Sequence, residues 1–256
     1  MIIAQNISKH FGKIEALKNI SFEIGKGEIV GFLGKNGAGK TTLMRILTTY
    51  LPPTSGRVLI AGQDIGRNSL SIRRKIGYLS ENPPLYLNMT VREYLRFAAR
   101  LKDIPARDTR ARIDKVLDDC RLLYVQNRPI AHLSKGYKQR IGIAQAIIHE
   151  PEVLILDEPT SGLDPVQIQQ VRNLIKDIEH KRTVLLSTHI LSEIEQIARR
   201  ILIINRGELI RDQSMEGLLK QEGAATLEEV FLKLNPPQAP YNPEGIFTGQ
   251  AQRFDD

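Results

Sequence analysis

The stretch from Gly34 to Thr41 constrains the fold of this chain more than any other, because it matches the P-loop pattern G-x-x-x-x-G-K-[ST]. The apolar run at 29–33 predicts a buried strand before the loop, and residues 42–47 predict a helix after it. Glycines let successive backbone N–H groups curl around phosphate oxygens, and the start of the helix adds a partial positive charge. A glycine-rich turn without a ligand is the alternative, but the strand, loop and helix together favour a nucleotide phosphate site.

Within this loop the side chains predict a division of labour. Lys40 is expected to reach the β- and γ-phosphates, and the Thr41 hydroxyl is expected to ligate Mg²⁺. The other contacts are expected from the backbone. The residues predicted to bind the nucleotide here are Gly34, Lys35, Asn36, Gly37, Ala38, Gly39, Lys40, Thr41 and Thr42.

A second motif pairs a short apolar run at 153–156 with two acids, Asp157 and Glu158. In a P-loop protein such a strand places the first acid where it can hold Mg²⁺ and the second where it can polarise an attacking water. A strand that simply ends at solvent is the alternative. Beside a complete P-loop, the acid pair favours nucleotide hydrolysis over nucleotide sensing alone.

His189 follows another predicted strand at 183–187. An isolated histidine after a strand usually caps an element or packs, and that interpretation stays open. The carboxyl ends of parallel strands gather ligands in open α/β sheets, so His189 is also a candidate for the same edge. A neutral imidazole there could donate a hydrogen bond to the γ-phosphate or orient the water.

The order of predicted elements indicates an α/β core with a helical insert. Strands are expected at 2–7, 13–16, 21–24, near 58–60 and at 76–79. Thr90 and Glu93 form a capping box that starts a helix, a second helix covers roughly 107–120, and a third begins after Ser134. From 151 onward strands and helices alternate again, with Asp164-Pro165 starting a helix, a further helix at 190–198 and a strand at 201–204.

Bulk properties exclude some classes of protein and leave others open. The single cysteine, Cys120, excludes an internal disulfide and fits a reducing cytosol. No stretch approaches the roughly 18 apolar residues of a membrane span, and the N-terminus lacks a signal-peptide layout. The net charge of +7 fits nucleic acid, an anionic membrane surface or solubility alone, so it decides nothing.

With these motifs in place, the chain resembles the ATP-binding subunit of an ABC transporter from residue 2 to about 234. The diagnostic segment is 133–140, Leu-Ser-Lys-Gly-Tyr-Lys-Gln-Arg, which is similar to the L-S-G-G-Q signature and its basic tail. Ser161-Gly162-Leu163-Asp164 matches the D-loop, so Asp164 is carried over as its acid. The P-loop, signature, acidic strand end, D-loop and His189 follow the family's order and separations.

The resemblance implies a P-loop NTPase (RecA-like) core, an antiparallel β subdomain and an inserted α-helical signature subdomain. The core is expected at about 1–84 and 151–220, the helical subdomain at about 85–150, and a flexible tail at 235–256. It also implies a dimer that sandwiches ATP and Mg²⁺ between one subunit's P-loop and the other's signature residues, Ser134, Lys135, Gly136 and Tyr137. Phe11 matches the position that stacks on adenine, with an ordinary core role as the alternative.

Three positions depart from the family's pattern. Lys135 and Tyr137 replace the usual glycine and glutamine, which leaves Ser134 and Gly136 as the safer phosphate contacts. Glu81 stands where the family has a glutamine, and its carboxylate is still a candidate Mg²⁺ ligand. Lys35 stands where proline is frequent, and a loop that binds through its backbone tolerates this change.

The segments at 81–86, 134–137 and 227–232 look most like the stand-alone ATPases of type-2 ABC exporters, including the gliding-motility and drug- or ion-export subgroup. The last of these segments, with residues 233 and 234, also fits a terminal amphipathic helix that only packs. The resemblance implies a separate transmembrane permease, a homodimer or a paralogous ATPase partner, and a peripheral location on the cytoplasmic face of the cell membrane. The segment 81–86 and the helical insert are the expected docking surface for that permease.

An ABC-like ATPase that acts on DNA or the ribosome is the alternative that the positive charge keeps open. Such proteins usually carry two cassettes or a long coiled coil between P-loop and signature, and residues 50–132 show no sustained heptads. We therefore expect no nucleic-acid partner. A regulator that only senses nucleotide conflicts with the presence of Asp157, Glu158 and His189.

Overall fold

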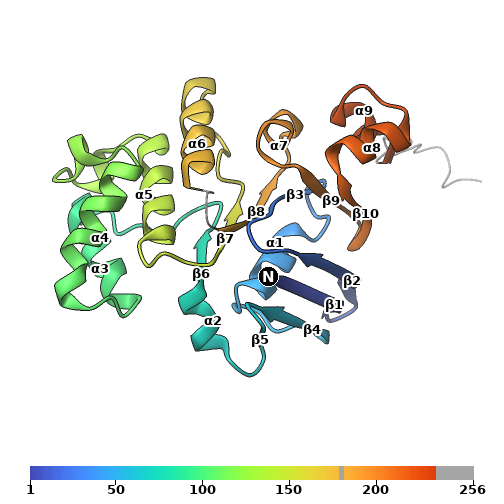
Figure 1. Ribbon diagram of the computed structural model, residues 1–256, viewed down its shortest axis with the longest axis horizontal. Helices are drawn as coiled ribbons and strands as arrows, with labels where there is room; N and C mark the ends of the chain where they lie inside the picture. The colour runs from blue at the N-terminus through green and yellow to red at the C-terminus, as the bar shows by residue number, and fades with distance from the viewer. Residues whose placement is uncertain (179–181, 235–256) are drawn as a thin grey trace, which may run out of the picture.

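The computed structural model describes residues 1–178 and 182–234, which form two sheets with helices around them (Figure 1). The larger sheet has six strands in the order β10-β9-β3-β8-β7-β6. Five of them run parallel, and β10 pairs antiparallel with β9 at one edge. Their bounds are β3 (Ile29–Leu33), β6 (Ile76–Leu79), β7 (Val153–Asp157), β8 (Thr183–Thr188), β9 (Arg200–Asn205) and β10 (Glu208–Ser214).

The parallel strands are buried on both faces, as their near-continuous apolar runs require. Alternate residues of β7 divide between two cores. Val153 and Ile155 pack with α1 (Lys40–Leu47) and the smaller sheet, whereas Leu154 and Leu156 face α5 (Lys135–Ile147) and α6 (Pro165–Ile178). Because side chains alternate across a strand, a five-residue strand holds both layers together.

The smaller sheet is antiparallel, with strand order β2-β1-β4-β5. Its strands are β1 (Ile2–Phe11), β2 (Ile14–Ile24), β4 (Ser55–Ile60) and β5 (Gln63–Asp64). The prediction of two short strands at 13–16 and 21–24 is wrong, because β2 runs through both. The polar residues between them belong to an irregular ladder in which Asn19 adopts a left-handed φ of 50°, so they look like a turn in the sequence.

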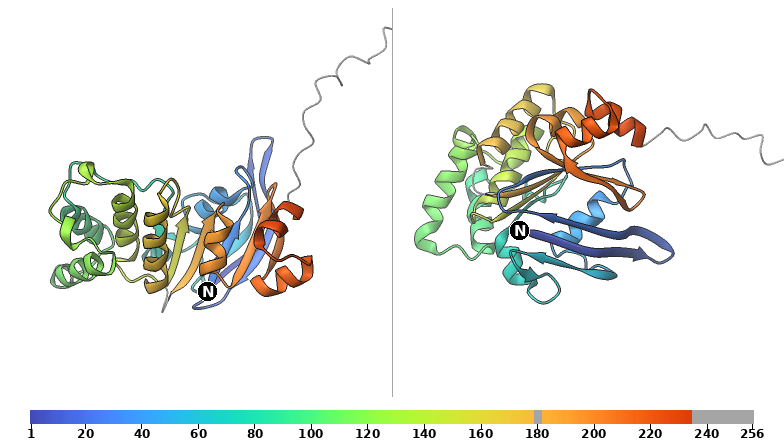
Figure 2. Two further views of the ribbon diagram at one scale, coloured as in Figure 1. Left: turned by 90° about the horizontal axis from the view of Figure 1, so that it is seen from above. Right: turned by 45° about the vertical axis from the view of Figure 1, so that its right-hand side comes forward.

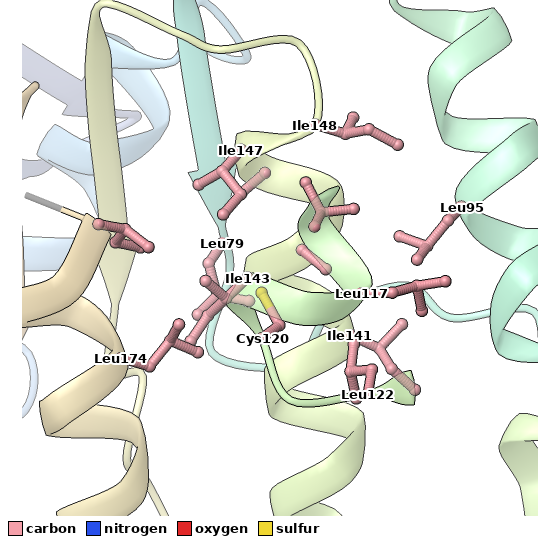
Figure 3. Packing of buried hydrophobic residues seen from close by; sticks show 14 of the residues in the cluster. Leu79, Leu95, Leu117, Cys120, Leu122, Ile141, Ile143, Ile147, Ile148 and Leu174 are labelled. Atoms are coloured by element: carbon pink, nitrogen blue, oxygen red, sulfur yellow. The ribbon is translucent and has the colours of Figure 1, made fainter. Parts of the chain in front are cut away.

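The helical insert lies at one end of the molecule (Figures 1 and 2). It contains α3 (Val91–Leu101), α4 (Ala106–Asp119), the short turns η1 (Leu123–Val125) and η2 (Ile130–His132), and α5. The capping box at the start of α3 is confirmed, since Thr90 accepts from the Glu93 N–H and Glu93 accepts from Thr90. The helices pack around Leu95, Leu117 and Ile141 (Figure 3).

Cys120 is fully buried in this packed cluster, as Figure 3 shows. Burial raises the pKa of its thiol above the ordinary range. The nucleophilic thiolate is therefore suppressed. Cys120 is therefore a packing residue of the helical insert.

The C-terminal part of the described chain adds α7 (Leu191–Ile197), α8 (Met215–Glu222) and α9 (Leu227–Leu234). Leu227 and Val230 of α9 are buried against α7 and α8. This packing agrees with the interpretation of residues 227–234 as a terminal amphipathic helix. The predicted tail at 235–256 lies outside the described residues. Sequence analysis missed α8 and β10. It also missed α2 (Ser69–Lys75), which lies between β5 and β6 in the chain. Among the described residues, no helix is both long and apolar enough to span a bilayer.

Candidate nucleotide site

The site lies at the carboxyl edge of the six-stranded sheet, where parallel strands deliver their following residues to one place. β3 leads into the P-loop, and β6 leads through Ser80 to Glu81. β7 is followed by Glu158, and its neighbour β8 is followed by His189. Residues that are far apart in the sequence therefore meet because their strands are neighbours.

The P-loop ends in an unusual backbone conformation at Gly39, the residue before α1. Its φ is 110°, and a Cβ there would lie 2.8 Å from the carbonyl oxygen of Ala16 and from Leu17. Only glycine fits such a position without strain. No side chain of the described residues caps the start of α1, so its first N–H groups are left for a ligand.

Lys40 is the first residue of α1 and is only 6% exposed. Its Nζ donates to the carbonyl oxygens of Gly34 at 2.6 Å and Lys35 at 3.3 Å, and it lies 3.8 Å from Glu158 Oε1. The loop's own carbonyls thus hold the ammonium within the site. Because an ammonium group has three N–H bonds, Lys40 could donate to a phosphate oxygen in addition to the two carbonyl oxygens.

Glu158 joins the strand end to His189. Its Oε2 is 2.7 Å from His189 Nδ1 and also accepts from the His189 backbone N–H at 3.3 Å. Glu158 is 7% exposed and has a left-handed φ of 49°. A non-glycine residue in that region is strained, and such strain is concentrated at functional sites.

Asp157 lies one residue deeper, and Ser187 Oγ donates to its Oδ1 at 2.5 Å. Burial raises the pKa of Asp157, and the negative charges of Glu158 and Glu81 add to this, while the hydrogen bond from Ser187 opposes it. Glu81 also approaches the D-loop, since the Ser161 hydroxyl donates to its Oε1 at 3.5 Å. Three carboxylates from two strand ends are therefore oriented toward one region.

A pocket of about 430 Å³ opens between these groups. Most of the predicted phosphate, metal and catalytic residues line it. Two further lining residues were not predicted for the pocket: Ala16, which belongs to no motif, and Ser161, which was matched to the D-loop but given no role in the site. The predicted residues among its lining are Lys35, Asn36, Gly37, Gly39, Lys40, Thr41, Thr42, Glu81, Glu158 and His189.

Other predicted residues lie outside this lining. Gly34 and Ala38 shape the loop from behind, and Asp157 is buried beneath it. Phe11 is 48% exposed at the tip of the β1–β2 hairpin, with Lys9 Nζ 5.4 Å from its ring centroid. This exposure removes the interpretation of Phe11 as an ordinary core residue, and the adenine-stacking role stays a prediction.

The signature residues begin α5, away from the P-loop pocket of the same chain. Ser134 caps the helix by accepting from the Tyr137 N–H at 3.5 Å, and both Ser134 and Lys135 are exposed. Gly136 is buried and lies so close to α6 that a Cβ there would be 2.7 Å from the Gln167 side chain. Asp164 accepts from the Gln167 N–H at 2.8 Å and so caps α6.

The oxygens near the pocket suit a hard cation, although no group of three or more His, Cys, Asp or Glu in the described residues is placed to hold a metal ion alone. Magnesium is usually held by one or two carboxylates plus a phosphate and waters, so a dense acid cluster is not required. The Thr41 hydroxyl and the Glu81 carboxylate line the pocket, and Asp157 adjoins it. This donor set fits Mg²⁺.

Comparison with known proteins agrees with this geometry. The ABC transporter family model matches residues 17–161, which is more than half of the chain. The chain belongs to the ABC transporter family. The bacitracin transport ATP-binding protein BcrA of Bacillus licheniformis is 40% identical over 223 residues, which cover 86% of this chain and 72% of BcrA.

Solved ABC transporter structures share the fold. The ATP-binding subunit of an ABC transporter superposes with a TM-score of 0.83 at 30% identity, covering 91% of this chain and 99% of that one. A dimeric ATP-binding cassette bound to ADP and Pi in a post-hydrolysis state gives a TM-score of 0.76 at 28% identity, covering 84% and 99%. The chain is thus an ATP-binding, ATP-hydrolysing ABC transporter subunit that powers a separate permease.

Proposed function

We propose that the pocket between the P-loop, Glu158 and His189 binds MgATP and hydrolyses it, with each residue in the role described below. The observation that carries this proposal is the convergence of three separate strand ends on one pocket beside Lys40. Backbone N–H groups at the start of α1 hold the phosphates, and Lys40 neutralises charge on the β- and γ-phosphates.

We assign Glu158 the role of accepting a proton from the attacking water and His189 that of orienting this carboxylate and the γ-phosphate, and the contact between the two residues supports both roles. The 2.7 Å contact between Glu158 and His189 Nδ1 fixes the carboxylate in direction, while Glu158 Oε1 faces Lys40. The left-handed backbone at Glu158 costs stability, while the contacts with His189 hold the carboxylate in direction, which is the kind of preorganisation that catalysis needs.

We assign Thr41, Asp157 and Glu81 as the groups that hold Mg²⁺. The bound cation would offset negative charge on the β- and γ-phosphates. The chain's own contribution is to keep these oxygens in place, through the Ser187 hydrogen bond to Asp157 and the Ser161 contact with Glu81.

Ser134, Lys135, Gly136 and Tyr137 are assigned to the ATP of a second subunit. Support comes from their absence among the described residues that line the P-loop pocket of their own chain, and from the exposed start of α5. The dimeric cassette bound to ADP and Pi supports a paired arrangement. Asp164 holds the start of α6 beside this surface. One chain carries every part, so a homodimer would have two equal sites; a paralogous ATPase subunit is the alternative partner.

The permease is expected to dock on an apolar groove of about 400 Å³ beside α3. Tyr86, Tyr94, Phe97 and Leu101 line this groove, and Tyr86 stacks edge-on against Phe97 at 5.1 Å. The first residue of its lining, Pro84, comes three residues after Glu81, which lines the nucleotide pocket, so the segment between them connects the groove to that pocket. The match to transporter ATP-binding proteins supports a peripheral location at the cytoplasmic face of the membrane. We propose the type-2 exporter subgroup for the transporter.

The test of the catalytic assignment is Glu158→Gln in the full chain. We expect ATP hydrolysis to fall by about 100-fold or more, because general base catalysis typically contributes at least that much. ATP binding should persist, and ATP should stabilise a dimer that size-exclusion chromatography detects.

Glu152→Gln is the matched control, because Glu152 precedes the opposite end of the same strand and pairs with Lys75 at 3.2 Å on the surface. Its turnover should stay within about twofold of wild type, as expected for a surface pair. Undiminished hydrolysis in Glu158→Gln would overturn the role assigned to Glu158.

A further inference from the structure

Glu193 of α7 is a buried carboxylate outside the nucleotide pocket, with only 3% of its surface exposed. Its Oε2 accepts hydrogen bonds from Thr160 Oγ1 at 2.6 Å and from Thr188 Oγ1 at 3.3 Å. Both threonines are themselves buried. A single oxygen atom therefore joins three elements: the loop after β7, the end of β8 and α7.

The two threonines flank the catalytic pair proposed above. Thr160 follows Glu158 by two residues and precedes Ser161, which lines the pocket. Thr188 immediately precedes His189, and its Oγ1 also accepts from the Ile190 N–H at 3.0 Å, so it fixes the backbone on both sides of His189.

This arrangement is costly as a packing solution. Burial raises the pKa of Glu193, which means that the folded protein disfavours its charge. Its Oε1 has no hydrogen-bond partner among the described residues, and neither does the buried Nε of Arg172 in the neighbouring helix α6. Apolar side chains of similar volume are often as stable as buried charges. The Glu193 contacts are thus better explained by positioning than by stability.

We propose that Glu193 is a positioning residue, whose Oε2 sets the Glu158–Ser161 loop relative to His189. It does not line the pocket, so it acts through Thr160 and Thr188. The inference rests on the proposed roles of Glu158 and His189. The hydrogen bonds of Glu193 to Thr160 and Thr188 connect α7 to the segments that follow β7 and β8. They thereby keep the Glu158 carboxylate and the His189 imidazole at hydrogen-bond distance.

Two substitutions of nearly equal volume separate an acceptor role from a packing role. Glu193→Gln keeps an oxygen that can accept from both threonines, and Glu193→Met removes it. We expect Glu193→Met to lower kcat for ATP by about tenfold or more, since misplacing a reacting group by about 1 Å can cost 100-fold. Glu193→Gln should stay within about threefold of wild type.

Thr160→Val tests the same contact from the other side, because it deletes the hydroxyl at constant shape. It should lower kcat, by no more than Glu193→Met does, because it removes one of the two hydrogen bonds that Glu193→Met removes. The double variant should then be no worse than Glu193→Met alone. The Kd for ATP, measured by equilibrium binding, should be unchanged in all of these variants because the P-loop is intact.

Three results would overturn the proposal: wild-type kcat with a lowered Tm in Glu193→Met, equal losses in the Gln and Met variants, or additive losses in the double variant. Glu158→Gln, measured in parallel, tells this failure from failure of the proposed function. If Glu158→Gln retains turnover, the catalytic assignment is wrong. If it loses turnover while Glu193→Met does not, only the positioning role is wrong.

Discussion

The starts of α1 and α5 are both assigned to phosphate, yet they are built differently. α1 begins after Gly39 in a left-handed conformation, without a side-chain cap, and Lys40 is held by loop carbonyls in a pocket. α5 begins after Ser134, whose side chain caps the helix, and its first residues are exposed. Helix α1 leaves its first N–H groups to a ligand, whereas helix α5 uses one of its own, that of Tyr137, in the hydrogen bond to Ser134.

The difference separates nucleotide binding within one chain, at α1, from a phosphate contact that needs a second subunit, at α5. A pocket assembled within one chain can bind nucleotide alone, because the backbone of α1 and the side chain of Lys40 are already in place. An exposed helix start needs a partner to bring the phosphate to it. We therefore expect changes at α1 to abolish binding, and changes at α5 to spare binding and reduce turnover.

The largest effect is expected from Gly39→Ala. The added Cβ would lie 2.8 Å from the Ala16 carbonyl and requires a backbone φ near 110°. We expect ATP affinity to fall by about 100-fold, or about 3 kcal/mol, as measured by equilibrium binding. Gly27→Ala is the control, since Gly27 also has a left-handed φ, 77°, but has open space and lies outside the pocket. Equal affinity in the two variants would remove the special status of the α1 start.

An intermediate effect is expected from Ser134→Ala. Loss of this cap should lower stability by about 1 kcal/mol. ATP hydrolysis should fall by about tenfold, because a hydrogen bond to a charged group contributes about 1.5–3 kcal/mol. The Kd for ATP should not change.

Ser214→Ala is the matched control for Ser134→Ala, because Ser214 caps α8 in the same way, accepting from the Gly217 N–H at 3.1 Å. It should lower Tm similarly and leave hydrolysis intact. If both serine variants lose hydrolysis to the same degree, stability alone explains the loss and the comparison between α1 and α5 fails.

The smallest effect is expected from Lys135→Ala. Lys135 stands where the family has glycine, and its Nζ lies against Gly162 of the D-loop. The backbone at Ser134 and Gly136 is expected to make the phosphate contacts, so turnover should change by about threefold or less, typical of an exposed charge. Lys138→Ala, on the same helix, is the control and should be neutral in an ATPase assay. A tenfold loss at Lys135 alone would show that the ammonium contacts phosphate.

Elements that a short sequence pattern specifies, such as an apolar strand or a capping box, were predicted correctly. Strand β6 has the predicted bounds, and the capping box at Thr90 is present with both hydrogen bonds. The elements that were missed lack such patterns. Helix α2 buries only Ile72 and has no side-chain cap, and β10 is an edge strand whose exposure does not alternate.

The same contrast holds for the site. The P-loop, Glu158 and His189 carry motifs, and the strand order brings them together. Glu193 could not be found from the sequence, since a single acid on a short helix is typical of a solvated surface. Its importance depends on Thr160 and Thr188, which only the packing of α7 brings within reach.

Helix α7 has one more neighbour. Its Glu195 accepts from the Leu227 N–H at 2.8 Å, and Leu227 and Val230 of α9 are buried in the same cluster as Ile194. The helix that points Glu193 toward the catalytic loops is therefore braced from behind by the last described helix. A chain shortened before Leu227 would keep every residue that lines the nucleotide pocket, yet it would lose the packing that holds α7, and with it Glu193, in place.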